Sequence, residues 1–194
     1  CTFRLPGDGF QLTVSNDLLI GSGGGLALGS TNGYSLLQVG RDLRLAGGSL
    51  SVHSGSNTAE GCGARISVNR DLLIGPSSWL QVYSHQTNGS SAFLTAGNLT
   101  ISAGGGINAN SKGYASGLGP GAGSAGGHSS GAGYGGQGGN ANTGGSGMPG
   151  GPTYGFTNAP LAPGSGGGGV RGGYGGGFVN MEIGGRAILD GTVS

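Results

Sequence analysis

Apolar and polar residues alternate in short runs between residues 12 and 111, and these runs recur along the chain. The stretch LTVSNDLLIGSGGGLALGS (12–30) returns as LQVGRDLRLAGGSLSVHSG (37–55), as ISVNRDLLIGPSSWLQVYS (66–84) and, more loosely, as LTAGNLTISAGGGINANS (94–111). Within each copy the apolar positions have a period of two, as in Leu18 with Ile20 or Leu50 with Val52. This period is typical of a β-strand with one buried face.

The copies align on one apolar position, and their spacing of about 25 to 29 residues is typical of stacked repeats. The aligned residues are Val14, Val39, Val68 and Ala96, and a partial fifth copy from Val179 matches at Ile183, Ala187 and Leu189. Short strands that cannot bury their apolar faces alone must stack on the next copy. We therefore predict an all-β fold, a parallel β-helix (β-solenoid) with almost no α-helix. A sandwich or jelly roll is the alternative, although it would not need this register between copies.

A short polar residue precedes a buried leucine at the same place in each copy. These residues are Asp17, Asp42, Asp71 and Asn98. We expect them to stack at a bend and to hydrogen-bond backbone groups two residues further on. A metal-binding or catalytic carboxylate ladder is the functional alternative, but stacked like charges repel, and Arg41 and Arg70 beside two of the aspartates indicate local neutralisation.

A glycine-rich segment separates the fourth and fifth copies. We assign residues 1–102 to solenoid rungs, 103–178 to an ordered glycine-rich insertion and 179–194 to a returning rung. An ordered segment of this kind must recover the entropy cost of glycine from backbone hydrogen bonds and close packing. Packed polyproline-II-like strands and irregular loops both fit. Tyr114, Tyr134, Tyr154 and Tyr174 are either anchors for these strands or spaced alike by coincidence.

The composition excludes several classes of function. Glycine supplies 52 of 194 residues and charged residues only 8%, whereas about a quarter of the residues are charged in ordinary domains. The net charge of +1 and the scattered basic residues argue against nucleic acid as a partner. No apolar run is long enough to span a membrane, and if the protein is exported, its signal has already been removed.

Candidate catalytic and cofactor motifs are weak. GAGSAG (121–126) satisfies a dinucleotide fingerprint but lacks the flanking strand and helix. His53 and His85 could approach each other on adjacent rungs, and His128 lies apart, yet no further metal ligands accompany them. Polysaccharide cleavage usually needs two carboxylates, and the chain offers few acids: Asp8, Asp17, Asp42, Glu60, Asp71, Glu182 and Asp190. We expect no enzymatic activity, no cofactor and no metal.

Two kinds of covalent modification are candidates. Cys1 and Cys62 could form a disulfide in an extracellular protein, and a first-position cysteine is also typical of a processed lipoprotein. Asn88 and Asn98 lie in glycosylation sequons. Asn88 is the better candidate, because it lies in a turn-like segment whereas Asn98 doubles as a bend residue.

The chain combines alternating rungs, a GGxGG-rich block and the closing stretch GGGFVNMEIGGRAILDGTVS (175–194). In these features it resembles large glycine-rich β-helical surface and secreted proteins of environmental bacteria. The resemblance implies an extracellular passenger, adhesin or fibre component and transfers no catalytic residue. We therefore expect an extracellular or cell-surface structural protein, a subunit or segment of a fibre, filament or adhesin. Its expected partners are copies of itself in end-to-end assembly and cell-surface glycans.

Two alternative functions remain open from the sequence. A polysaccharide-binding or polysaccharide-cleaving β-helix would use a groove with aromatic residues such as Trp79, Tyr83 and Tyr34. We expect Trp79 and Tyr83 to face opposite sides unless the turn at Pro76 shifts the register, with core packing as the default for Trp79. An ice-binding protein is the second alternative, but the threonines show no rung period.

Overall fold

The chain forms two compact units. The computed structural model describes residues 2–5, 9–29, 32–56, 61–126, 128–142, 147–156, 158 and 160–194, with the backbone alone for residues 2–5 and Val170. The solenoid unit comprises residues 1–83, 91–109 and 179–194, and the glycine-rich unit comprises residues 84–90 and 110–178.

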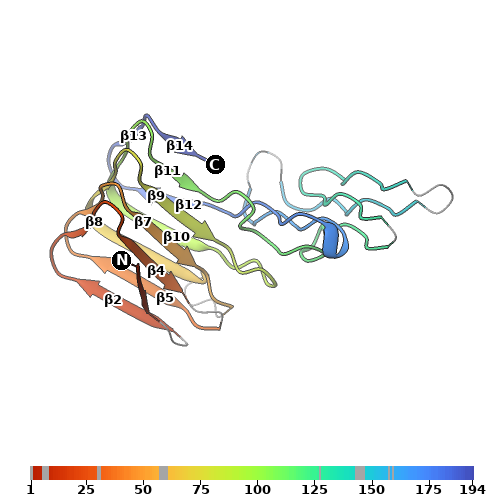
Figure 1. Ribbon diagram of the computed structural model, residues 1–194, viewed down its shortest axis with the longest axis horizontal. Helices are drawn as coiled ribbons and strands as arrows, with labels where there is room; N and C mark the ends of the chain where they lie inside the picture. Colours follow the sequence, from red (N-terminus) through yellow and green to blue (C-terminus); the bar gives the residue numbers. More distant parts are fainter. Residues whose placement is uncertain are drawn as a thin grey trace. The chain divides into compact units, whose positions relative to one another are not determined.

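The solenoid unit is built from parallel strands (Figure 1). They are β1 (Thr2–Leu5), β2 (Phe10–Val14), β3 (Leu18–Ile20), β4 (Gly25–Gly29), β5 (Ser35–Val39), β6 (Leu43–Leu45), β7 (Ser49–His53), β8 (Ala64–Ile74), β9 (Trp79–Tyr83), β10 (Ala92–Ile101), β11 (Gly106–Asn108), β12 (Asn180–Ile183), β13 (Ala187–Leu189) and β14 (Thr192–Val193).

Each copy of the repeat forms one rung, and the rungs stack into two sheets. Sheet A has the order β1-β4-β7-β9-β11-β14, and sheet B has the order β12-β10-β8-β5-β2, with β13 beside β10 and β6 between β3 and β8. Every pairing between these strands is parallel and joins neighbouring rungs. The predicted parallel β-solenoid is therefore confirmed, and the only helix in the described chain is the one-turn 3-10 segment η1 (Gly169–Arg171).

The register of the sheets follows the repeat. The residues that align the copies are direct cross-strand partners: Val14, Val39, Val68, Ala96 and Ile183. Inward positions thereby form apolar columns, such as Leu18, Leu43, Leu72, Leu99 and Ala187. The inner rungs are buried, with Leu37, Leu43, Leu50 and Leu72 each 0% exposed. Because a slip of one residue would turn every column outward, this pattern specifies the register strongly.

The solenoid unit extends beyond the expected boundary at residue 103. Gly106 and Ile107 of β11 pair with Trp79 and Leu80 of β9, so the fourth rung continues to Ala109. The glycines before β11 are the turn that lets the chain reach sheet A, rather than the start of the inserted segment.

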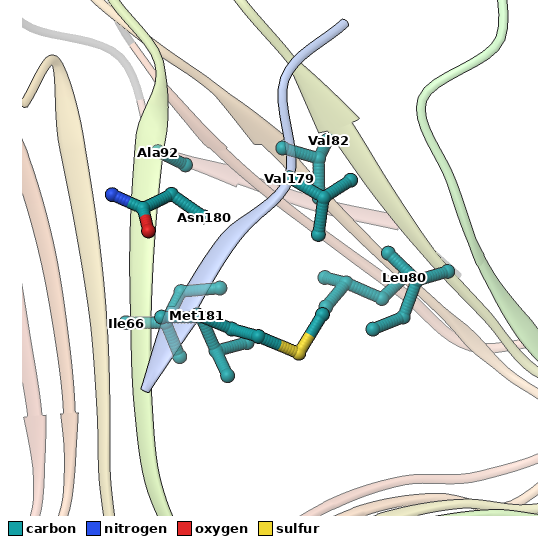
Figure 2. A pocket seen from close by; sticks show the side chains of 9 residues that line it. Ile66, Leu80, Val82, Ala92, Val179, Asn180 and Met181 are labelled. Carbon is teal, nitrogen blue, oxygen red and sulfur yellow. The ribbon is translucent and has the colours of Figure 1, made fainter. Parts of the chain in front are cut away.

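A small packing defect lies in the core. Figure 2 shows it between the last rungs, with the Met181 side chain lying between Ile66 and Leu80. Its volume is about 10 Å³, close to the smallest space that holds one water, and its lining is mainly apolar. The defect is therefore too small for more than one water.

The glycine-rich unit is held by backbone hydrogen bonds between extended segments. Its described residues form no strand or helix apart from η1 and an isolated bridge between Ala141 and Met148. Three segments join in a closed ring: Tyr114 N–H donates to the Gly164 carbonyl (3.1 Å), Gly164 N–H to Gly176 (2.8 Å) and Gly175 N–H to Tyr114 (2.9 Å). Gly168 (φ −61°, ψ 136°) and Gly172 (φ −71°, ψ 150°) have polyproline-II geometry.

Tyrosine rings pack directly on glycines in this unit. A Cβ on Gly119 would lie 2.8 Å from the Tyr114 ring, and one on Gly121 would lie 2.6 Å from Tyr154. Tyr134 and Tyr154 also form an edge-to-face pair with centroids 4.7 Å apart. The anchor interpretation fits these three tyrosines, whereas Tyr174 is 50% exposed.

Neighbouring glycines give a matched test of this packing. A Cβ on Gly175 would clash with the Gly164 carbonyl, whereas one on Gly176 would meet nothing within 4 Å. We expect Gly175→Ala to destabilise the glycine-rich unit by about 1–3 kcal/mol, and Gly176→Ala to leave it near wild type. Hydrogen exchange of residues 110–178 measures both. Equal protection in the two variants would contradict this packing.

Candidate functional site

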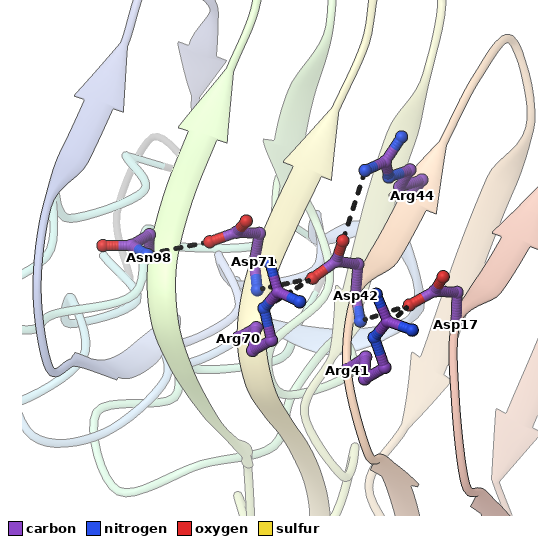
Figure 3. A network of polar contacts seen from close by, with 7 residues as sticks. All are labelled: Asp17, Arg41, Asp42, Arg44, Arg70, Asp71 and Asn98. Atoms are coloured by element: carbon purple, nitrogen blue, oxygen red, sulfur yellow. Dashed lines mark hydrogen bonds and ion pairs between the residues drawn. The ribbon is translucent and has the colours of Figure 1, made fainter.

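The polar bend residues form a continuous ladder along the solenoid (Figure 3). Asp17 Oδ1 accepts the Asp42 backbone N–H (3.2 Å), and Asp42 Oδ1 accepts the Asp71 N–H (3.4 Å). The Asn98 side-chain amide donates to Asp71 Oδ1 (2.8 Å), and Asn98 Oδ1 accepts the Arg186 N–H (2.9 Å). Each side chain therefore joins its rung to the next one.

These partners differ from the expected ones. The expectation placed them two residues further on, as in an ordinary Asx turn, but they lie 25 and 29 residues further on for Asp17 and Asp42. The reason is the parallel stacking, which brings the N–H of the same position on the next rung within reach. The Asp and Asn residues thus act between rungs.

Arginines neutralise the ladder. Arg41 Nε lies 3.6 Å from Asp17 Oδ1, and Arg70 Nε lies 3.7 Å from Asp42 Oδ1. Arg44 adds a contact of 3.2 Å to Asp42 Oδ2. Burial of Asp42, which is 4% exposed, acts to raise its pKa, but the hydrogen bonds from Arg44 and the Asp71 N–H and the charge of Arg70 outweigh it and lower the pKa. The Asp42 carboxylate therefore stays ionised and links its rung to the next one.

Trp79 and Tyr83 lie on the same outer face of sheet A. The expectation of opposite faces was wrong, because residues four apart in one strand point to the same side. Their strand β9 alternates partly exposed and buried side chains, with Leu80 and Val82 inward. Trp79 is thus outside the core, and the Tyr83 ring stacks on His53 of the neighbouring rung with centroids 4.1 Å apart. Tyr34 lies beside Gly9, Phe10 and Leu36, at the strands β2 and β5 of sheet B.

The turns leading into sheet A are glycine turns in most rungs. Gly23 (φ 69°), Gly47 (φ 81°) and Gly104 (φ 79°) occupy the same left-handed position. The third rung departs from this rule, because Ser77 takes that position with a φ of 57°. A side chain in this conformation costs about 1–2 kcal/mol.

Ser78 holds the exceptional turn in place. Its side chain is fully buried, and its hydroxyl donates to the Leu45 carbonyl (2.9 Å) while it accepts the Gly47 N–H (2.8 Å). The Ser77 N–H donates to the Gly104 carbonyl (2.9 Å). The turn is therefore tied to the rungs on both sides.

A groove of about 230 Å³ lies beside this turn. Its lining residues are Gly23, Gly24, Gly25, Gly47, Gly48, Ser49, Ser77 and Trp79. Ser49 and Gly106 are the cross-strand neighbours of Trp79 on either side, and a Cβ on Gly106 would lie 2.7 Å from Trp79 Cζ3. The indole thus rests on Gly106 and forms the wall of a groove with a bare backbone floor.

The histidines have separate surroundings. His53 stacks on Tyr83, whereas His85 Nδ1 accepts the Asn88 N–H at 3.3 Å. The described residues contain no group of three or more metal-ligating side chains. Asp8 and Glu60 lie outside the described residues.

The two sequons differ in their surroundings. Asn88 is exposed, and its Oδ1 accepts the Ser90 N–H at 3.0 Å. Asn98 uses both ends of its amide in the ladder. Cys62 is buried, at 6% exposure, and Cys1 lies outside the described residues, so their pairing stays a prediction. In the described part of the chain, no helix has the length and apolar character needed to cross a membrane.

The ladder predicts an acid-dependent loss of stability. The folded-state pKa of Asp42 lies below its ordinary value of 3.8, so its contribution is present above about pH 4 and is lost as the pH falls through the folded-state pKa. We expect Asp42→Asn to melt at a lower temperature than wild type at pH 7, with the difference shrinking towards pH 2. Thermal melts at several pH values measure this, with Asn16→Ala as the exposed control. A difference independent of pH would contradict the role of the charge.

The sequons predict selective glycosylation. In a secretory host that adds N-linked glycans, we expect a glycan at Asn88, and Asn88→Gln to abolish the mass increase. Asn98→Gln should leave it unchanged, because the Asn98 amide is engaged between rungs. Intact-mass spectrometry tests both variants, and a glycan on Asn98 would show that the ladder opens at that rung.

Comparison of the chain with protein-family models, with curated proteins and with solved structures yields no match. Its function is therefore inferred from its own residues and geometry.

Proposed function

We propose that the chain is an extracellular structural protein, a subunit or segment of a fibre, surface filament or adhesin that works by stacking and contact. The supporting observation is the open fifth rung. Leu189 and Val193 continue inward columns, with Ile101 and Ile107 as their partners in the rung below, yet they are 56% and 46% exposed. A further rung, from the same chain or from a second copy, would bury them.

The first rung presents the complementary surface. Leu12 and Leu18 start the columns that end at Met181 and Ala187, and both are only partly buried. β2 and β3 form the outer edge of sheet B at this end, whereas β12 and β13 lie at the other. Head-to-tail stacking of two copies would therefore continue each column in the same register, which is the heterologous contact that generates filaments.

Charge supports the same arrangement. The ladder begins at Asp17 in the first rung. It ends at Arg186 in the fifth rung, where the Arg186 N–H donates to Asn98 Oδ1. In a head-to-tail stack, the exposed Arg186 of one copy would lie next to Asp17 of the following copy. Opposite charges would then meet at the junction, as Arg41 and Asp17 already do between the first two rungs.

The resemblance to glycine-rich surface and secreted β-helical proteins supports an extracellular location. The low charge supports association between copies. A charged residue fraction of 8% leaves little repulsion between copies. The surface function rests on this resemblance and on the open rung together.

Assembly is tested by light scattering and negative-stain electron microscopy over a range of protein concentrations. We expect concentration-dependent end-to-end stacks of uniform width. Leu189→Lys should raise the concentration needed by about tenfold or more, because it would bury a charge at the junction. The matched control is Leu73→Lys, on the outward side of an inner rung. Monomers at every concentration, or equal effects of both variants, would contradict the proposal.

A further inference from the structure

We propose that the groove beside Trp79 is a binding site for a neutral glycan chain. The turn of the third rung departs from the glycine rule of the turns into sheet A. Ser77 keeps a left-handed backbone where the equivalent positions of the first, second and fourth rungs are glycine, and strain of this kind persists where the surroundings enforce it, often at functional sites. Here Ser78 supplies the enforcement through its bonds to Leu45 and Gly47.

The chemistry of the groove suits a sugar. One aromatic wall, two hydroxyl side chains and a floor of glycine backbone line it. Ligand sites of this kind combine an apolar surface with a few polar groups that fix orientation. The apolar face of a pyranose ring can stack on the indole, while the side-chain hydroxyls of Ser49 and Ser77 hydrogen-bond its hydroxyls. Among the residues whose side chains the structure describes, none that lines the groove is charged, which disfavours an anionic glycan.

The outer face of β9 extends the site beyond the groove. Gln81 and Tyr83 follow Trp79 on the same outer face, and the stacked rings of Tyr83 and His53 add a second aromatic surface. Trp79 and Tyr83 are four residue steps apart along the strand, about 13 Å, which is longer than a single sugar ring. An oligosaccharide lying along the strand would contact both, with the Gln81 amide between them.

The test uses the single tryptophan of the chain as its reporter. The probes are cellohexaose, xylohexaose, mannohexaose and laminarihexaose, with an oligogalacturonate as the anionic comparison. We expect a saturable change in Trp79 fluorescence with at least one neutral probe and a weaker response to the anionic one. The absence of a saturable change with all four neutral probes, or a preference for the anionic one, overturns the proposal.

Variants measured by calorimetry locate the site. Trp79→Ala should weaken binding by about tenfold or more, and Trp79→Phe should retain part of it. Ser77→Gly should raise the melting temperature by relieving the left-handed strain, yet weaken binding by about three- to tenfold. Ser49→Tyr should block the groove and serves as a second test if Trp79→Ala fails to fold. Wild-type affinity in Ser77→Gly and Ser49→Tyr would place binding elsewhere and overturn the assignment.

The site is independent of assembly. Leu189→Lys lies on the open fifth rung, so we expect it to bind the neutral probe as wild type does. If Leu189→Lys loses stacking but binds the probe, the groove assignment stands without the proposed assembly. If Ser49→Tyr loses binding but still stacks, the structural role stands without it.

Discussion

The register of hydrogen bonding between successive rungs is the constraint on which the solenoid depends. Parallel strands about 4.8 Å apart place equivalent residues over one another, so each inward side chain meets its counterpart from the next copy. The Asp and Asn ladder strengthens this constraint at the bend, because each side chain accepts or donates across the gap between rungs. Apolar columns and polar joints thus specify the same alignment by different chemistry.

Much of this arrangement could be predicted from the sequence, because the apolar positions and the repeat copies recur at short and nearly constant intervals. The alternation of apolar residues defines the inward face, and the nearly constant copy length defines which residues become partners. Val14 and Val39 pair for that reason. The ladder partners were harder to predict, because an aspartate at a bend can bond its own turn or the next rung, and only the stacked geometry decides between them.

The groove depends on residues that share no local pattern. Its floor comes from the glycines of two rungs and its wall from the third, so no single stretch of sequence contains it. The left-handed conformation of Ser77 is equally hidden, although alignment of the turns places Ser77 with Gly23, Gly47 and Gly104. For the glycine-rich unit, the sequence predicted closely packed extended segments or loops, but not the contacts between them. Contacts such as Tyr114 on Gly119 join segments that have no fixed repeat.

The position of the glycine-rich insertion affects how such a chain can diversify. The inserted segment leaves after β11 and returns before β12, strands of neighbouring rungs. Its two ends are therefore anchored by the solenoid, and the entropy cost of closing a flexible loop rises only with the logarithm of its length. Insertions of different length or composition could be exchanged at this point while the columns above and below keep their partners. The solenoid would then serve as a constant frame for a variable surface.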